Sequence, residues 1–184
     1  MNRSENGKKT MEYVERLRKE PSFARRLERL AQLEEGRAYC GHDLNHFLST
    51  ARIAWILCLE SGLSMDKEQI YLCALLHDLG RVEEYQERIS HDEASAAFAG
   101  EILCHIGYDE RKTGEICAAI ASHRKRRKLW ENGTFTEQNF MERRPGSLAE
   151  LLALADQLSR NCYLCPVSGS CKWAEEEKTG GIII

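Results

Sequence analysis

The chain has 184 residues, with 26 lysines and arginines against 29 aspartates and glutamates, and a net charge of −3. This length suits one domain with a hydrophobic core and small appendages. The near balance of charge argues against nucleic acid as a partner. The first 20 residues have no apolar segment typical of a secretion signal, and no apolar run reaches the length of a membrane span. We therefore expect a cytoplasmic protein.

Apolar residues recur at helical spacing along nearly the whole chain, and strand-like alternation is almost absent. The predicted class is all-α, with about six to eight helices packed as a bundle. The predicted helices cover about 7–20, 21–36, 43–61, 66–80, 90–106, 109–124 and 147–160. The helix at 66–80 is apolar nearly all round, so it should be the central one. Residues 125–146 lack clean periodicity and are predicted to be a loop, and the final GGIII suits a short strand or a contact in a homo-oligomer.

Five of these helices each place potential metal ligands near one end or on an apolar face, and these are His46, His77 with Asp78, His91, His123 and Asp156. Each alone has an ordinary explanation as a hydrogen-bonded core or cap residue. Burying all six without compensation would cost several kcal/mol each, so they need a shared partner. One or two divalent cations would satisfy all six. The mixture of imidazole and carboxylate suits iron, manganese, zinc or cobalt.

In this order of a histidine, an adjacent His-Asp pair, two more histidines and a late aspartate, the sequence resembles the HD superfamily of metal-dependent phosphohydrolases. The resemblance covers residues 38–160, which would form the HD domain, between an N-terminal helical extension (1–37) and a Cys-rich tail (161–184). It implies that His46, His77, Asp78 and Asp156 bind a first metal. His91 and His123 would bind a second metal, and Asp78 would bridge the two. The motif order is similar to that of the bacterial symmetrical dinucleoside tetraphosphate hydrolases.

The resemblance implies hydrolysis of a phosphate ester or anhydride, with a nucleotide or dinucleoside polyphosphate as the small-molecule substrate and a metal-activated hydroxide as the nucleophile. Asp78 and Arg81 would act at the reacting centre. Iron or manganese is the expected metal, and zinc, cobalt and nickel also fit. Two alternatives stay open. The same ligands would serve a di-iron oxygenase of this fold, and a non-catalytic protein could use the site to sense nucleotide, iron or redox state.

Substrate phosphates need cations besides the metals. The candidates are Arg81, Arg52, and Arg124 with Lys125 in the basic run that follows His123. Such a run is usually a solvated surface, and phosphate capture is the alternative interpretation. His42 and His105 match no ligand position of the family. Both are expected to be cap or surface residues, although His42 could support a ligand.

Eight cysteines are many for a chain of this kind. Four of them lie in apolar helical stretches, where a reduced cysteine is a small hydrophobic residue, and these are Cys58, Cys73, Cys104 and Cys117.

The remaining cysteines include Cys162, Cys165 and Cys171, which have a spacing typical of metal sites. Cys40 is the candidate fourth ligand. It precedes His46 by six residues, as Cys162 follows Asp156 by six. If the helices that carry His46 and Asp156 meet at one metal and run antiparallel, six residues of each lead in the same direction. Both cysteines would then lie about 9 Å from the metal, at the same end of the helix pair. The set would hold a structural zinc or an iron–sulfur cluster; the alternative is four reduced thiols in an unconstrained tail.

Overall fold

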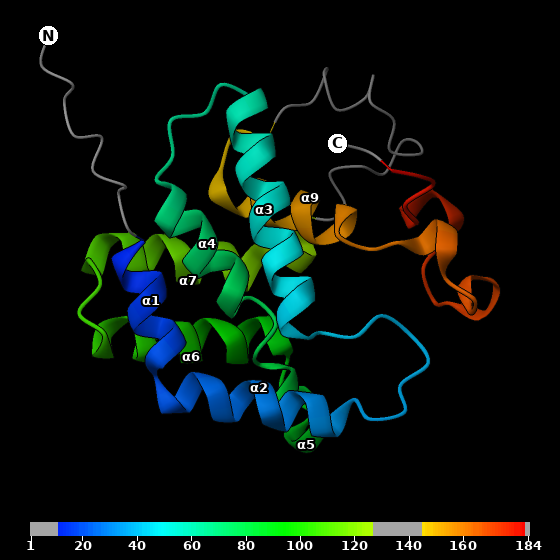
Figure 1. The fold of residues 1–184 in the computed structure, drawn as a ribbon, viewed down its shortest axis with the longest axis horizontal. Helices are drawn as coiled ribbons and strands as arrows, with labels where there is room; N and C mark the ends of the chain where they lie inside the picture. Colours follow the sequence, from blue (N-terminus) through cyan, green and yellow to red (C-terminus); the bar gives the residue numbers. More distant parts are fainter. Residues whose placement is uncertain (1–10, 127–144, 183–184) are drawn as a thin grey trace, which may run out of the picture.

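The computed structural model describes residues 11–126 and 145–182, and these ranges are helical without any strand (Figure 1). The predicted all-α class is confirmed. The α-helices are α1 (Glu12–Lys19), α2 (Pro21–Leu33), α3 (Leu44–Glu60), α4 (Lys67–Leu76), α5 (Arg81–Glu87), α6 (His91–His105), α7 (Glu110–Arg126) and α9 (Leu148–Leu158). Single 3₁₀ turns follow at η2 (Cys162–Leu164), η3 (Ser168–Ser170) and η4 (Glu175–Glu177). Most of the predicted loop at 125–146 and the last two residues of GGIII lie outside the described residues.

Helix α4 occupies the centre of the core, as its apolar sequence predicts. Seven of its ten residues are buried, and Leu72 and Leu76 have no exposed surface. The helix packs against α3, α7, α6, α9 and α1. Because α4 is surrounded in this way, the chain that leaves its C-terminal end begins inside the core.

Helix α4 ends at Leu76, four residues earlier than predicted, and His77–Gly80 form a turn. This turn lies directly against the start of α6, where the Gly80 amide donates a hydrogen bond of 2.7 Å to Ser95 Oγ. A Cβ atom on Gly80 would lie 2.2 Å from the Ser95 nitrogen and 2.4 Å from the His91 carbonyl oxygen. A residue without a side chain is therefore required for this close approach, which brings the His77–Asp78 pair next to His91.

The loop between α2 and α3 and the C-terminal tail lie on the same side of the bundle, at the right of Figure 1. The Tyr39 hydroxyl joins them by donating to the Ser170 carbonyl at 3.2 Å. The tail is anchored to α9 as well, because the Thr179 hydroxyl donates to the Gln157 carbonyl at 3.1 Å. None of the described helices combines the length and the apolar character that crossing a membrane would require.

We expect Gly80→Ala to destabilise the protein by about 1–3 kcal/mol, because the added methyl group collides with backbone atoms that cannot give way easily. Gly114→Ala on α7 is the matched control, since a Cβ there meets no atom within 4 Å. Alanine in that open helical position should be neutral or stabilising by up to about 1 kcal/mol. Urea unfolding measures both variants, and equal stability of the two would contradict the close approach.

Candidate metal centre

Five segments of the bundle bring the six predicted ligands to one buried point. His46 lies in the first turn of α3, the His77–Asp78 pair follows α4, and His91 begins α6. His123 lies near the end of α7 and Asp156 near the end of α9. The His46 side chain is 11% exposed, and the other five side chains are 7% exposed or less.

The ligand atoms form two groups, within each of which all atoms lie within 4.8 Å of one another. One group contains His46, His77, Asp78 and Asp156, and the other contains Asp78, His91 and His123. Asp78 belongs to both groups. Its Oδ2 lies 3.6 Å from His77 Nε2, and its Oδ1 lies 3.2 Å from His91 Nε2 and 3.9 Å from His123 Nε2. The single carboxylate therefore turns one oxygen toward each group.

The histidine rings are oriented by hydrogen bonds at Nδ1, on the side away from the centre. His77 Nδ1 lies 2.8 Å from the Ala74 carbonyl, and His123 Nδ1 lies 2.6 Å from the Ile120 carbonyl. A carbonyl only accepts, so Nδ1 carries the proton in both rings and the neutral Nε2 has a free lone pair. His46 Nδ1 lies 3.1 Å from Ser159 Oγ, and that hydroxyl donates its own proton to the Asp156 carbonyl at 2.7 Å. The serine therefore accepts from His46, and the same tautomer follows.

The atoms that face the centre are buried and have no hydrogen-bond partner in the protein. They are Nε2 of His46, His77 and His91 and Oδ1 of Asp78. Buried polar atoms are almost always satisfied, so a cluster of lone pairs without hydrogen bonds is typical of a site that binds a cation. Nitrogen and carboxylate donors in this number fit divalent transition metals.

The pKa shifts of Asp78, His46 and His123 favour the form that binds cations, whereas the shift of His77 opposes it. Burial alone would raise the pKa of Asp78, but the Arg81 guanidinium, with Nε 3.0 Å from Oδ2, and the neighbouring histidines lower it well below its usual range. Burial lowers the pKa of His46 and of His123 to about 4, so both rings are neutral at pH 7. The pKa of His77 moves upward, because Asp78 and Asp156 outweigh the effect of its burial.

His42 also reaches the centre, where the sequence predicted a cap or surface residue that could support a ligand. It is 9% exposed, and its Nε2 lies 3.5 Å from Asp78 Oδ2. On the other side its Nδ1 pairs with Glu34 at the end of α2. Burial acts to raise the pKa of Glu34, but the hydrogen bond and charge of His42 lower it to about 2. A second carboxylate thus supports the ring that faces Asp78. His105, in contrast, is 72% exposed, as expected for a surface residue.

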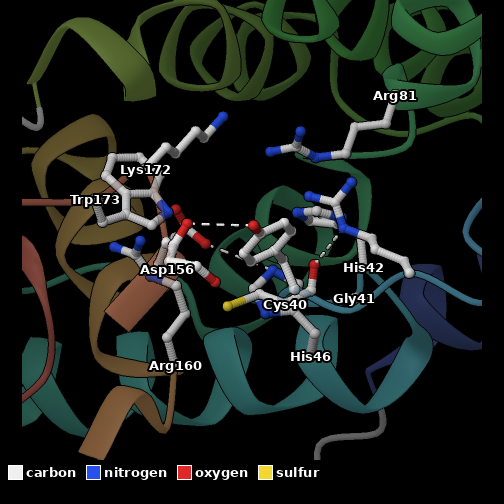
Figure 2. A pocket seen from close by; sticks show the side chains of 13 residues that line it. Cys40, Gly41, His42, His46, Arg81, Asp156, Arg160, Lys172 and Trp173 are labelled. Atoms are coloured by element: carbon white, nitrogen blue, oxygen red, sulfur yellow. Dashed lines mark hydrogen bonds and ion pairs between the residues drawn. The ribbon is translucent and has the colours of Figure 1, made fainter. Parts of the chain in front are cut away.

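A cavity of about 240 Å³ opens beside the centre, with His46, His42 and Asp156 in its wall. Four basic side chains line the same cavity, namely Arg37, Arg81, Arg160 and Lys172. Figure 2 shows Arg160, Lys172 and Trp173 on one side of the opening and Arg81 and His42 on the other. The side chain of Arg160 is buried, its Nη1 and Nη2 have no hydrogen-bond partner, and its guanidinium carbon lies 4.6 Å from the centre of the Trp173 ring.

Of the predicted phosphate contacts, Arg81 lines this cavity, whereas Arg52 is exposed on α3 and is not part of the wall. Arg52 follows His46 by six residues, and 100° per residue turns it away from the ligand face of the helix. The backbone of Arg124 and Lys125 belongs to α7, but their side chains lie outside the described residues.

Three basic residues of the cavity wall were not predicted as phosphate contacts, namely Arg37, Arg160 and Lys172. For Arg160 a signal existed, since it follows Asp156 by four residues and the helix predicted over 147–160 would place both side chains on one face, although α9 itself ends at Leu158.

The cysteines are all free, and Cys40 and Cys171 both line the cavity. The sequence predicted that Cys40 and Cys162 lie close together because both extend antiparallel helices, and this reason is wrong. Helix α3 begins at Leu44 and α9 ends at Leu158, so neither Cys40 nor Cys162 lies on the helix that carries its neighbouring ligand. The two segments are brought together by loops.

The sequence profile of the HD domain family matches residues 43–161, a range that contains all six of these ligands. The chain belongs to the HD domain family. This HD protein is 35% identical over 152 residues to an uncharacterized protein of Clostridium beijerinckii. The aligned residues make up 83% of this chain and 86% of the relative. Its fold is similar to the 1.45 Å crystal structure of a predicted HD superfamily hydrolase from an uncultured Thermotogales bacterium. The TM-score is 0.55 at 20% identity, over 90% of this chain and 86% of that chain.

The match to the family and the buried groups of candidate ligands support each other, because the matched residues include the His-Asp pair and its partners on the other helices. The HD protein is a metal-dependent hydrolase, as the motif order predicted.

Acid should destabilise the metal-free HD protein. The pKa of His46 and of His123 is about 4 in the folded state against about 6.5 when unfolded, so the unfolded state binds more protons between these values. The pKa of His91 is lowered too, and only that of His77 is shifted upward. The free energy of unfolding after EDTA treatment is therefore expected to fall as the pH drops from 7 toward 4. Urea titrations of His123→Gln should show a shallower dependence on pH than those of the unsubstituted protein, and equal slopes for the two proteins would refute this.

Proposed function

We propose that the protein hydrolyses a phosphate ester or anhydride of a nucleotide or dinucleoside polyphosphate at a dinuclear metal centre. His46, His77, Asp78 and Asp156 would hold one metal, and Asp78, His91 and His123 the other. The support is that Asp78 belongs to both ligand groups and directs one oxygen to each. Iron or manganese fits this donor set best, and zinc, cobalt or nickel would also bind it. Two such metals, when bound, lower the pKa of water and neutralise charge on phosphate oxygens.

Arg81 connects the centre to the substrate site. Its Nε pairs with Asp78 Oδ2 at 3.0 Å, and its Nη1 donates to Glu84 at 3.2 Å. These two carboxylates hold the guanidinium in one orientation at the wall of the cavity. Arg81 thereby keeps Asp78 ionised and presents positive charge to a phosphate group that lies over the centre.

The observation that carries the choice of a phosphate substrate is the free guanidinium edge of Arg160. Its Nε donates to the Gln157 carbonyl at 3.3 Å, but Nη1 and Nη2 have no hydrogen-bond partner. A buried charged donor that lacks an acceptor costs free energy, so these two nitrogens suit an anionic acceptor in the cavity. Arg37, Arg81 and Lys172 add positive charge in the same wall, which suits several phosphates rather than one carboxylate. Tyr39 and Trp173 also line the cavity, and aromatic rings of this kind suit the base of a nucleotide.

The reaction class is tested by phosphate release from nucleotides and dinucleoside polyphosphates, with protein purified anaerobically and its metals measured. We expect Asp78→Asn to lower the rate at least about a hundredfold, because it removes the charge that both ligand groups share. Glu93→Gln, an exposed change on α6, is the control and should leave the rate unchanged. Bound metal with oxygen uptake and no phosphate release would replace the hydrolase by an oxygenase, and tight nucleotide binding without turnover would indicate a sensor.

The phosphate site is tested separately with Arg160→Met, which keeps an apolar side chain against Trp173 but removes the charge. A hydrogen bond to a charged group contributes about 1.5–3 kcal/mol, so KM for the cleaved substrate should rise about 10- to 100-fold while the metal content stays the same. Arg52→Met removes an arginine that lies outside the cavity and should leave KM unchanged. Equal KM values for the two variants would show that Arg160 does not contact substrate.

A further inference from the structure

Four cysteines lie outside the helical core, and three of them come from a segment that buries little apolar surface. Cys162, Cys165 and Cys171 lie in the tail, whose Leu164 and Ile182 side chains are 74% and 86% exposed. Over 161–182 the described tail contains only single 3₁₀ turns, and its buried side chains are Lys178 and Thr179. Such a segment gains too little from hydrophobic burial to offset its conformational entropy. Some other constraint must hold it in place.

The tail cysteines gather around Cys40, which comes from the loop before α3. Cys40 and Cys171 line the same cavity, and the neighbouring Tyr39 and Ser170 are joined by a hydrogen bond of 3.2 Å. Burial raises the pKa of the Cys40 thiol, Arg160 opposes this, and Cys162, Cys165 and Cys171 each raise it further. The three tail thiols therefore lie close enough to Cys40 to act on its charge, and none of the four forms a disulfide.

Turns and cations around the four thiols suit a negatively charged group. The Cys165 amide donates to the Cys162 carbonyl at 3.2 Å, and the Cys171 amide donates to the Ser168 carbonyl at 3.2 Å, so tight turns present the three tail thiols. The Lys178 amino group donates to that same Ser168 carbonyl at 2.8 Å. Four thiolates with a bound metal remain anionic, and Arg160 and Lys178 provide the opposite charge nearby.

The separation of the sulfur atoms distinguishes two kinds of metal site. Among the described residues, the groups whose ligand atoms lie within 4.8 Å of one another are the two at Asp78, and the cysteines do not form such a group. A tetrahedral zinc with Zn–S bonds of about 2.3 Å would hold its sulfurs about 3.8 Å apart. A [4Fe–4S] cluster binds one thiolate at each of its irons, so its cysteine sulfurs stand farther apart than those around one zinc.

We propose that Cys40, Cys162, Cys165 and Cys171 bind an iron–sulfur cluster that fastens the C-terminal tail to the loop before α3. Tyr39 and Gly41 flank Cys40 in the chain, Ser170 and Lys172 flank Cys171, and all four line the cavity. The cluster thus shapes part of the cavity wall. It leaves the six histidine and aspartate ligands untouched.

The experiment measures iron and acid-labile sulfide in the full-length protein after anaerobic purification or reconstitution with iron and sulfide. We expect about four sulfides per chain and a broad visible absorption that reductant bleaches. Cys165→Ser, which is not part of the cavity wall, should lose both. Cys104→Ser, at an exposed cysteine on α6, should keep both. Acid-labile sulfide belongs only to the cluster, so this result is independent of iron at Asp78 and of any hydrolysis.

Attachment of the tail is tested by limited trypsin digestion after helical content has been checked by circular dichroism. Cleavage after Lys172 should be at least about tenfold faster in Cys165→Ser than in Cys104→Ser, because the open form of the tail becomes more populated. One zinc per chain in place of sulfide would overturn the cluster. A protein that contains neither zinc nor acid-labile sulfide would overturn it as well. Sulfide retained in Cys165→Ser would overturn the ligand set. Equal cleavage of the two variants would show that the cluster does not fasten the tail.

Discussion

The arrangement of the helices depends on one buried carboxylate, that of Asp78, which is 1% exposed. His42, His77, His91 and His123 each direct a ring nitrogen toward it, and Arg81 pairs with it at 3.0 Å. A lone negative charge in such a place would be prohibitively costly, so the surrounding segments compensate it with these imidazoles and the guanidinium, whereas α9 brings a second carboxylate, Asp156, into the same group. Packing of the core and assembly of the centre are therefore one constraint, because a helix that shifts in the bundle also withdraws a partner from Asp78.

The ends of helices provide much of the support for the ligands. The last carbonyl groups of a helix have no partner within it. The Ala74 carbonyl near the end of α4 accepts from His77, and the Asp156 carbonyl near the end of α9 accepts from Ser159, which in turn holds His46. Each helix thus uses a terminal carbonyl to orient a ring, directly at His77 and through the Ser159 hydroxyl at His46. This explains how apolar helices can deliver polar ligands at the points where they stop.

The parts of the site that the sequence predicts are those that depend on local pattern. Helical periodicity predicts α4 as the central helix, and the order of histidines and aspartates identifies the family and its ligand positions. The cavity wall could not be predicted in this way, because Arg37 and Lys172 approach the centre from loops whose course is decided by tertiary contacts. His42 was predicted to be a cap or surface residue that could support a ligand, and its approach to Asp78 was not predicted, since its position before α3 has no periodic signal. The position of the Arg160 guanidinium depends on the tail as well, because it lies against the ring of Trp173.

The pair formed by Glu34 and His42 bears on where the working unit of this protein begins. Glu34 closes α2, and His42 lies just before the matched family segment of 43–161. A chain shortened to that segment would keep all six ligands, yet it would lack the imidazole that faces Asp78 and the carboxylate behind it. It would also lack Arg37 and Tyr39 on one wall of the cavity and Lys172 and Trp173 on the other. The functional unit is thus longer than the segment that the family shares, and its first helices take part in the electrostatics of the centre.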